Sequence, residues 1–362
     1  MLHILHTEWS GNWGGQENRI VREMKGLQAR GYRVTLACTP YAHIAKVAQA
    51  ESIPTHFLPF KGNTDLKTLW GLVRFIREQR VDIVNTHSGK DTWVGGFAAK
   101  LAGAKFIRTR HLSNSINPSR LNFINELADF VITTGESVRA QMIVDNRIRP
   151  DRIQSIPSGI NACQFDPQRY DRSTFRAQYC LQPDEFAIGI VAILRRFKRH
   201  DLFVDIAKDL LSRHTHLKFY IAGIGPQEAA IRERIARYGL ESKIILTGYL
   251  NNPAELLAAL DCFLLTSDGF EGVSQSLIQA LMMNIPSIVA DVGSLKDLYD
   301  GENFILVEPG KVESFVKAVE SLLANPAQLS DLATHARASI LSRFSDDYML
   351  ESIIKVYEKL MA

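Results

Sequence analysis

The sequence of 362 residues is poor in the features that mark secreted, metal-bound or membrane-spanning proteins. Its four cysteines, Cys38, Cys163, Cys180 and Cys262, form no C-x-x-C pair, so we expect reduced thiols in or beside the core and no structural zinc site. No apolar run approaches the ~20 residues that a membrane-spanning helix needs. Polar residues interrupt the first eight positions, which argues against a signal peptide. We therefore expect a cytoplasmic protein.

Cofactor motifs are missing as well. No G-x-G-x-x-G follows an expected strand, so a dinucleotide site is not predicted. No group of His, Cys, Asp and Glu has metal-ligand spacing, and there is no Asp-x-Asp triplet. We expect no cofactor and no metal, and nothing in the sequence predicts a nucleic-acid partner.

The net charge of +3 is small, but it is unevenly distributed. Residues 1–168 contain 21 Lys and Arg against 14 Asp and Glu, whereas residues 169–362 contain 21 against 25. A basic first half suits an anionic partner such as a lipid surface. Unevenly placed surface charge without a partner is the alternative.

Short apolar runs alternate with amphipathic segments along the chain, which predicts an α/β protein with parallel, doubly wound sheets. In the first half we expect strands at 2–5, 33–38, 55–58, 82–87, 106–111, 130–134 and 153–157. After a polar stretch at 166–184, which we interpret as a linker, strands are expected at 186–194, 217–222, 243–248, 262–265, 287–290 and 304–307. The chain beyond residue 311 is expected to be mostly helical. A helix is also expected at 65–80, with Leu66, Leu69, Val73 and Ile76 facing inward.

Residues 266–284 join an expected strand to an expected helix through a loop that contains Gly269, Glu271 and Gly272. Ser274 is placed to cap the helix. Free N–H groups at a helix N-terminus attract an anion. Because a carboxylate would repel a phosphate, we expect Glu271 to face a neutral polar group. A phosphate beside a polyol describes a nucleotide sugar.

A basic segment follows the first expected strand of the second half. Arg195, Arg196 and Lys198 lie within six positions that also include Arg199 and His200. Cations at the carboxyl end of a parallel strand suit a diphosphate. A solvated basic turn is the alternative.

The stretch around Glu271 resembles the acidic motif Glu-Gly-Phe-x5-Glu-Ala of retaining, GT-B-fold glycosyltransferases of family 4. Gln279 takes the place of the second glutamate. Residues 156–161, Ile-Pro-Ser-Gly-Ile-Asn, and Phe165 are similar to the same family's signature at the domain junction. The resemblance implies two Rossmann-like domains facing a cleft, 1–165 and 166–344, with a C-terminal helix, 345–362, crossing back to the first domain.

The resemblance also implies roles for individual residues. Glu271 and His111 would act at the donor sugar. The donor would be bound by glycines where the backbone approaches it, by the basic segment, by N–H groups at the helix N-terminus and by an amide at the ribose, namely Gly15, Arg195, Arg196, Lys198, Gly223, Gly225, Gly272, Val273, Ser274 and Gln279.

The implied function is a retaining, metal-independent transfer of a sugar from a nucleoside diphosphate, expected to be UDP, to a hydroxyl of a glycan or lipid-linked acceptor in bacterial cell-surface polysaccharide synthesis. Two alternatives stay open: a GT-B UDP-sugar epimerase and a non-catalytic nucleotide-sugar-binding protein. The basic helix at 65–80, which carries Trp70 and Phe75, further suggests weak peripheral contact with the cytoplasmic face of the inner membrane.

Overall fold

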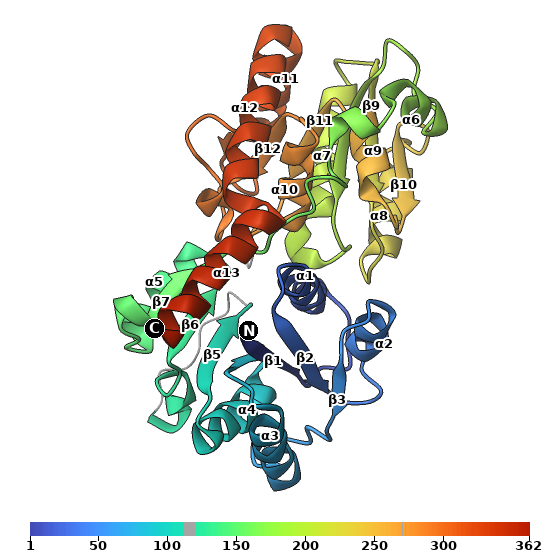
Figure 1. Ribbon diagram of the computed structural model, residues 1–362. Helices are drawn as coiled ribbons and strands as arrows, with labels where there is room; N and C mark the ends of the chain where they lie inside the picture. The colour runs from blue at the N-terminus through green and yellow to red at the C-terminus, as the bar shows by residue number, and fades with distance from the viewer. Residues whose placement is uncertain (112–119, 270, 272) are drawn as a thin grey trace. The chain divides into compact units, whose positions relative to one another are not determined.

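The computed structural model describes residues 1–111, 120–269, 271 and 273–362, and it divides the chain into two compact units. Unit 1 contains Met1–Gly159 and Asp346–Ala362, and unit 2 contains Ile160–Ser345 (Figure 1). The polar stretch at 166–184 is not a linker. It lies within unit 2 and forms η3 (Pro167–Arg169) and α6 (Arg172–Gln178).

Unit 1 is built on a seven-stranded parallel sheet of order β3-β2-β1-β4-β5-β6-β7. Its strands are β1 (His3–Glu8), β2 (Arg33–Cys38), β3 (Thr55–Phe57), β4 (Ile83–Thr86), β5 (Lys105–Arg110), β6 (Phe130–Thr133) and β7 (Ile153–Ser155). Its helices are α1 (Gly15–Ala29), α2 (His43–Ala50), α3 (Leu66–Gln79), α4 (Gly89–Ala102), η1 (Arg120–Asn125), α5 (Glu136–Asp145), η2 (Pro150–Arg152) and α13 (Asp346–Met361).

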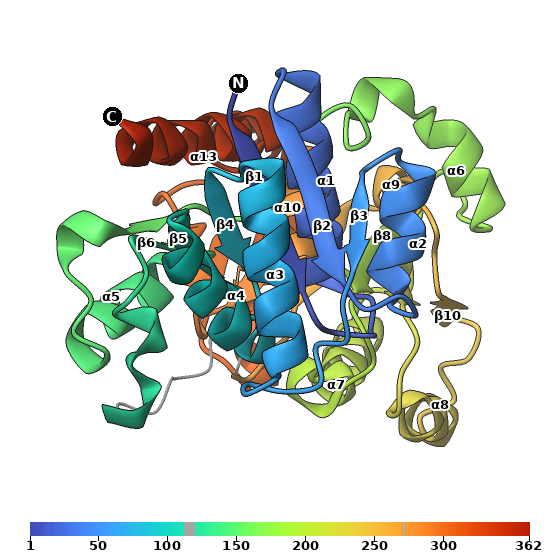
Figure 2. The ribbon, with the colours of Figure 1, turned by 60° about the horizontal axis from the view of Figure 1, so that its bottom comes forward.

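Helix α13 follows unit 2 in the chain but packs into unit 1, as the family resemblance implied. It lies beside α1 (Figure 2). Five of its apolar side chains join the apolar cluster formed with α1, α2 and the strands, namely Met349, Leu350, Ile353, Val356 and Tyr357. The core of unit 1 is therefore completed by the last residues of the chain.

Helix α3 differs in one respect from the predicted pattern. Leu66 is its first residue and is 65% exposed, while Leu72 is buried together with Val73 and Ile76. The Asp65 side chain caps this helix by accepting from the Thr68 N–H, so Leu66 lies in the first turn, where no preceding helical turn covers its side chain. The predicted inward position of Leu66 is wrong.

Unit 2 is built on a six-stranded parallel sheet of order β10-β9-β8-β11-β12-β13. Its strands are β8 (Phe186–Val191), β9 (Leu217–Ala222), β10 (Ile244–Gly248), β11 (Cys262–Leu265), β12 (Ser287–Ala290) and β13 (Ile305–Val307). Its further helices are η4 (Arg196–Lys198), α7 (His200–Leu211), α8 (Glu228–Arg237), α9 (Pro253–Ala259), α10 (Gln275–Met282), η5 (Leu295–Asp297), α11 (Val312–Ala324) and α12 (Pro326–Phe344). The predicted pair of parallel α/β domains is confirmed.

The cysteines are only partly where the sequence placed them. Cys38 and Cys262 are buried, but Cys163 and Cys180 are exposed, so the prediction of core thiols is wrong for these two. Both exposed residues lie close to the irregular segment around η3 and α6, where the apolar neighbours in the sequence belong to turns rather than to strands. No helix in the described part of the chain has the length and apolar character needed to cross a membrane.

Candidate functional site

The carboxyl edge of the unit 2 sheet holds a buried ion pair. Lys198, at the end of η4, places its Nζ 2.7 Å from each carboxylate oxygen of Glu271. Ser267 donates its hydroxyl to Glu271 Oε2 at 2.7 Å. Lys198 is 9% exposed and Glu271 is 6% exposed. In this structure Glu271 therefore faces a cation, because the loops after β8 and β11 end at the same edge of the sheet, and its expected contact with a neutral polar group of a ligand stays a prediction.

The backbone around this ion pair is held by contacts that the sequence analysis missed. Gly293 has φ +56°, and a Cβ at this position would lie 2.1 Å from the carbonyl oxygen of Glu271. The N–H of Ser294 donates to that same carbonyl at 3.0 Å. Thr266 donates its hydroxyl to the carbonyl of Lys198 at 2.9 Å, which ties the two loops together. A glycine three residues after β12 was the only sequence signal for this support.

Helix α10 begins at Gln275, after the loop that carries Glu271, as predicted. The Ser274 hydroxyl accepts from the Leu277 N–H at 3.4 Å and caps the helix. Val273 is partly buried against the apolar cluster of this unit, and Gln279 lies on α10 and is also partly buried. The predicted donor-binding residue Gly272 lies outside the described residues.

Gly223 and Gly225 are required by close packing between two loops. A Cβ on Gly223, whose φ is +138°, would lie 2.0 Å from the carbonyl oxygen of Ala192, and one on Gly225 would lie 2.7 Å from that of Leu194. Both glycines thus let the loop after β9 approach the loop after β8. This contact explains the glycines without a ligand.

An apolar pocket of about 370 Å³ opens beside these glycines, at the ends of β8, β9 and β10. It is lined by Val191, Ala192, Ile193, Ala222, Gly223, Ile224, Tyr249, Leu250 and Pro253. Ile193 and Ile224 are exposed despite their apolar side chains. This pocket is not evident from the sequence, because its walls come from three separate loops.

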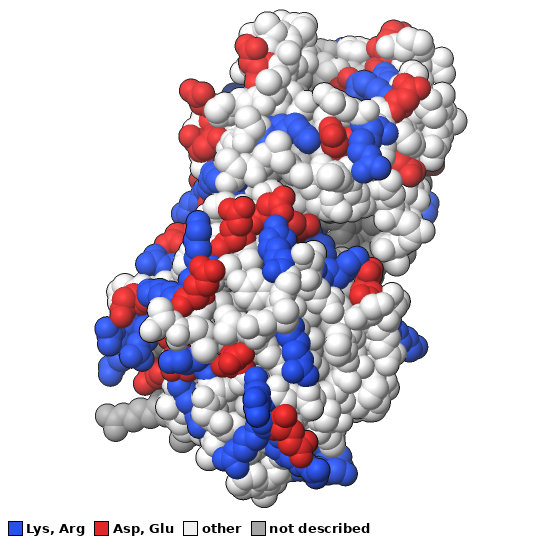
Figure 3. Space-filling model, viewed as in Figure 1, with Lys and Arg blue, Asp and Glu red and all other residues white. Residues whose placement is uncertain are grey.

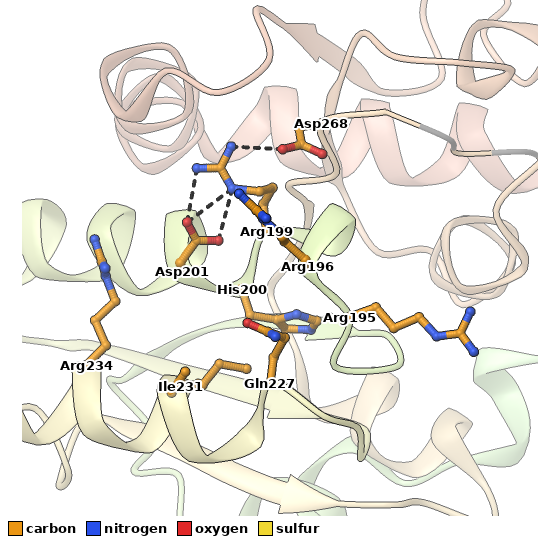
Figure 4. Close-up of a pocket in the computed structure, with 10 residues that line it drawn as sticks. Arg195, Arg196, Arg199, His200, Asp201, Gln227, Ile231, Arg234 and Asp268 are labelled. Atoms are coloured by element: carbon orange, nitrogen blue, oxygen red, sulfur yellow. Dashed lines mark hydrogen bonds and ion pairs between the residues drawn. The ribbon is translucent and has the colours of Figure 1, made fainter.

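Arg195 and Arg196 line a second pocket, which Figure 4 shows, between the start of α7 and helix α8. Arg199 is already paired there, with Asp201 at 3.0 Å and with Asp268 at 3.1 Å. Arg195 extends away from this pair (Figure 4). Lys198 is not among the residues that line this pocket. The predicted diphosphate-binding cations are thus divided between the pocket and the Lys198–Glu271 pair.

The carboxyl edge of the unit 1 sheet carries three histidines in a row. His6 lies on β1, His87 follows β4 and His111 follows β5. Nδ1 of His6 lies 2.9 Å from Nε2 of His87, and Nδ1 of His87 lies 2.9 Å from Nε2 of His111. Burial, reinforced for His87 by the neighbouring His111, lowers the pKa of all three rings, that of His6 to about 3. The predicted site residue His111 is therefore one end of a neutral chain of rings.

Two buried carboxyl groups, those of Glu8 and Asp91, lie at the same edge of the sheet. Glu8 accepts hydrogen bonds from the Ser10 N–H, from Gln16 Nε2 and from the Ser88 hydroxyl. Burial, and then the nearby Asp91, raise the pKa of Glu8 to about 8. Gly15, the predicted glycine of this edge, begins α1 and has open space where a side chain would be.

The raised pKa of Glu8 predicts a pH-dependent effect of Glu8→Gln. A carboxyl group that binds its proton more tightly in the folded state stabilises that state. This contribution is complete below the ordinary pKa of 4.5 and is lost as the pH rises through the folded-state pKa of about 8. The amide cannot ionise, so the variant is expected to match the wild type near pH 5 and to exceed it by about 2–4 kcal/mol at pH 9. All four tryptophans lie in residues 9–93, so tryptophan fluorescence during urea unfolding reports on unit 1.

The control for this prediction is Glu126→Gln, a change of the same kind at an exposed position of unit 1. It is expected to alter stability by less than about 0.5 kcal/mol at either pH. Equal stability differences for Glu8→Gln at pH 5 and pH 9 would show that Glu8 ionises normally.

Comparison with known proteins identifies the class of enzyme to which this protein belongs. Residues 13–163 match the family described as Glycosyltransferase Family 4, and residues 185–325 match the family described as Glycosyl transferases group 1. The 2-deoxystreptamine N-acetyl-D-glucosaminyltransferase of Niallia circulans is 24% identical over 95% of this chain and 97% of its own length. The UDP-Gal:alpha-D-GlcNAc-diphosphoundecaprenol alpha-1,3-galactosyltransferase of Escherichia coli is 22% identical over 98% and 96%.

Solved structures agree with the observed fold. A glycosyltransferase from Rickettsia africae superimposes with a TM-score of 0.90 at 20% identity and covers 99% of this chain and 98% of its own. HepE from Anabaena, solved in complex with UDP, superimposes with a TM-score of 0.88 at 19% identity and covers 99% and 100%. The two family matches lie one in each half of the chain, and each half contains one of the two parallel sheets. The chain belongs to the GT-B-fold glycosyltransferases of the family 4 type.

Proposed function

We propose that this glycosyltransferase moves a sugar from a UDP-sugar to a hydroxyl group of a glycan or lipid-linked acceptor, with retention at the anomeric carbon and without a metal ion. The observation that carries the proposal is the buried Lys198–Glu271 pair beside the N-terminus of α10. A cation and a helix N-terminus favour a diphosphate, and a carboxylate accepts hydrogen bonds from sugar hydroxyls. The relative from Escherichia coli whose name includes UDP-Gal and the UDP complex of HepE support this choice of donor.

The apolar pocket beside Gly223 suits the nucleobase. It offers flat aliphatic surface from Ile193 and Leu250 and an aromatic side chain, Tyr249, at the same sheet edge as Lys198. A planar base placed there would be removed from water, while backbone groups of the surrounding loops could bind its polar edge. Gln279 would then bind the ribose, since its amide both donates and accepts hydrogen bonds.

The diphosphate would be bound by Lys198, with Arg195 and Arg196 as further cations of the same loop. Binding must separate Lys198 from Glu271 or share the ammonium between the two, because both carboxylate oxygens occupy it now. Glu271 would be released toward the sugar in the same step. In this proposal the ion pair keeps both charges satisfied until the donor arrives.

The proposed chemistry forms the new bond on the face from which the diphosphate leaves. The bond from C1 to the phosphate oxygen breaks, an acceptor oxygen attacks C1, and the leaving phosphate takes the proton of the acceptor hydroxyl. Lys198 and the N–H groups at the start of α10 would stabilise the departing charge, which is the role that a metal ion has in other transferases. In this proposal Glu271 accepts hydrogen bonds from the sugar hydroxyls, while the Ser267 hydroxyl continues to donate to it, and it forms no bond to C1.

The test combines donor binding with product analysis. We expect UDP and UDP-sugars, but not other nucleoside diphosphates, to raise the melting temperature, and we expect transfer to an acceptor in the presence of a chelator with the product anomer unchanged from the donor. Epimerised donor without acceptor would support the epimerase instead, and binding without transfer or slow hydrolysis would support a binding protein. Loss of activity on chelation, or an inverted product, would contradict the proposal.

Gly293→Ala offers a test of the support behind Glu271. The methyl group would meet the Glu271 carbonyl and would occupy a left-handed backbone position, so the acidic loop must move. We expect a loss of about 1–3 kcal/mol in stability and at least a tenfold loss in kcat, with UDP binding changed less than transfer. Gly310→Ala is the control, because its φ is also positive but its added methyl group meets nothing within 4 Å. Equal effects of both changes on kcat would show that strain alone is responsible.

Peripheral membrane contact through unit 1 is part of the same proposal. Helix α3 exposes Leu66 and Trp70, which is 59% exposed, together with Lys67 and Arg74. Lys and Arg side chains are visible over the region of α3 with acidic side chains among them (Figure 3), and Arg74 is paired with Glu78 at 2.7 Å. The surface thus combines one aromatic anchor with few free cations, which favours weak, salt-reversible binding.

Co-sedimentation with vesicles tests this contact. We expect binding to anionic vesicles at low salt, release at high salt and a clear loss of binding in Trp70→Ser. Lys355→Ser, an exposed change on the unrelated helix α13, is expected to bind as the wild type does. Absence of binding at low salt would contradict membrane contact and leave the transferase proposal intact.

A further inference from the structure

The three histidines at the edge of the unit 1 sheet form one hydrogen-bonded chain. The strands β1, β4 and β5 that position them are direct neighbours in the sheet, and all three run in the same direction. The His6 and His87 rings are nearly parallel, at 8° to each other, with centroids 5.2 Å apart, and the centroids of His87 and His111 are also 5.2 Å apart. Each pair of facing ring nitrogens, at 2.9 Å, has hydrogen-bond length.

A nitrogen–nitrogen contact of this length holds one proton. With two protons, two N–H groups would face each other. With no proton, two nitrogen lone pairs would face each other. A neutral imidazole carries one proton on one of its two nitrogens. With one proton per ring and one per contact, only two arrangements remain: all three histidines carry the proton on Nδ1, or all three carry it on Nε2. The tautomer of any one ring therefore fixes the tautomers of the other two.

The buried end of the chain distinguishes the two arrangements. Nε2 of His6 is fully buried and has no hydrogen-bond partner among the described residues. An N–H group buried without an acceptor is among the rarest features of folded proteins, whereas an unpaired acceptor is tolerated more often. The arrangement in which His6 Nε2 carries no proton is the one with all protons on Nδ1. His111, at the partly exposed end, then presents Nδ1–H.

We propose that His6, His87 and His111 share the Nδ1–H tautomer, and that His6 and His87 are positioning residues which make His111 a hydrogen-bond donor. The geometry that carries this is the pair of 2.9 Å contacts together with the unpaired Nε2 of His6. The consequence for catalysis rests on the proposed function: His111 would donate to an oxygen of the donor sugar and would not act as a base. The tautomer assignment itself does not depend on sugar transfer.

Nuclear magnetic resonance of protein labelled with ¹⁵N in its ten histidines tests the tautomers directly, since protonated and bare ring nitrogens have widely separated shifts. Single histidine replacements assign the signals. We expect Nδ1–H in all three rings of the wild type at neutral pH. In His87→Phe the contact to His111 is lost, and His111 is expected to return to Nε2–H, the form that free histidine favours. His56 is a partly buried histidine of unit 1 that does not belong to the three hydrogen-bonded histidines. His56→Phe is therefore expected to leave the tautomers of His6, His87 and His111 unchanged.

His6→Asn and His87→Phe separate positioning from general damage. An asparagine amide can donate from the place of His6 Nδ1, so His6→Asn is expected to keep Nδ1–H at His87 and His111 and to keep kcat within about threefold of the wild type. His87→Phe is expected to lower kcat about tenfold or more while UDP affinity stays within about threefold. Tryptophan fluorescence confirms that unit 1 is folded in each variant.

Any of three spectra would overturn the proposal: unlike tautomers within the chain, Nε2–H in all three rings, or a charged ring at neutral pH. The wild-type spectrum decides this even if a variant fails to fold. The expected spectra with unchanged kcat in His87→Phe would retain the shared tautomer and would reject His111 as a contact of the sugar.

Discussion

Replacing Lys198 with methionine is expected to destabilise unit 2 by about 3–5 kcal/mol, because among the described residues it leaves the buried Glu271 carboxylate with the Ser267 hydroxyl as its one side-chain partner. The methionine chain fills most of the lysine's volume, so the loss is one of charge rather than of packing. The same change removes the cation proposed for the diphosphate. We expect kcat/KM to fall by about 10²-fold or more and UDP binding to weaken.

A double-mutant cycle isolates the ion pair. Glu271→Gln alone leaves a buried ammonium, which is costly in the same way, whereas Lys198→Met with Glu271→Gln leaves no unpaired charge. The double variant is therefore expected to be more stable than the sum of the single changes by at least about 1 kcal/mol, yet to remain inactive. Circular dichroism follows unfolding of both units, and tryptophan fluorescence marks the transition of unit 1.

Lys296→Met is the matched control, since Lys296 is an exposed lysine of unit 2. It is expected to alter stability by less than about 0.5 kcal/mol and to leave activity unchanged. Additive effects in the cycle would show that Lys198 and Glu271 are not coupled in solution. Full activity of Lys198→Met would remove the lysine from the diphosphate site.

Most of the strands could be predicted from the sequence because buried parallel strands are nearly continuous apolar runs. The predicted strand at 217–222 agrees with β9 to the residue, and the run at 186–194 gives β8 with its end three residues too late. The overrun has a physical cause: residues 192–194 are apolar because they form pocket wall and core, not because they pair in the sheet. Apolar character alone does not separate these roles.

The contacts that build the sites could not be predicted, because they join residues that are distant in the sequence. Lys198 and Glu271 are 73 positions apart, and the order β1-β4-β5 brings His6 beside His87 across 81 positions. The sequence indicates strands but not which strands are neighbours. The sequence could mark a residue such as Lys198 as a candidate for the site, but it could not show which side chain that residue contacts.

Buried charge was the other feature that hydrophobic periodicity could not indicate. Arg19 lies on α1 and is fully buried, donating to the Ile156 carbonyl at 2.8 Å with Glu23 3.9 Å away. Tyr357 donates its hydroxyl to the same glutamate at 3.2 Å. In the sequence, a charged pair such as Arg19 and Glu23 indicates the solvent-facing side of a helix. In the structure α13 packs beside α1 and helps to bury this pair.

Removal of residues 346–362 is expected to unfold unit 1. Helix α13 buries five apolar side chains, each contributing about 1.5–3 kcal/mol, so its loss forfeits about 10 kcal/mol, which equals the whole stability of many domains. Its loss also removes the Tyr357 hydroxyl that donates to the buried Glu23. We expect tryptophan fluorescence of the truncated protein to show an unfolded unit 1 without denaturant, while a urea transition of unit 2 remains visible by circular dichroism.

Point variants on α13 test the same contact without removing chain. Ile353 is fully buried, so Ile353→Ala is expected to cost about 2–5 kcal/mol in the fluorescence transition of unit 1. Glu351→Ala, an exposed change on the same helix, is expected to cost less than about 0.5 kcal/mol. Because unit 2 ends where α13 begins, neither variant should move the unit 2 transition. A stable unit 1 without residues 346–362 would mean that the sheet and its own helices suffice, and that the helix serves to join the two units rather than to fold the first.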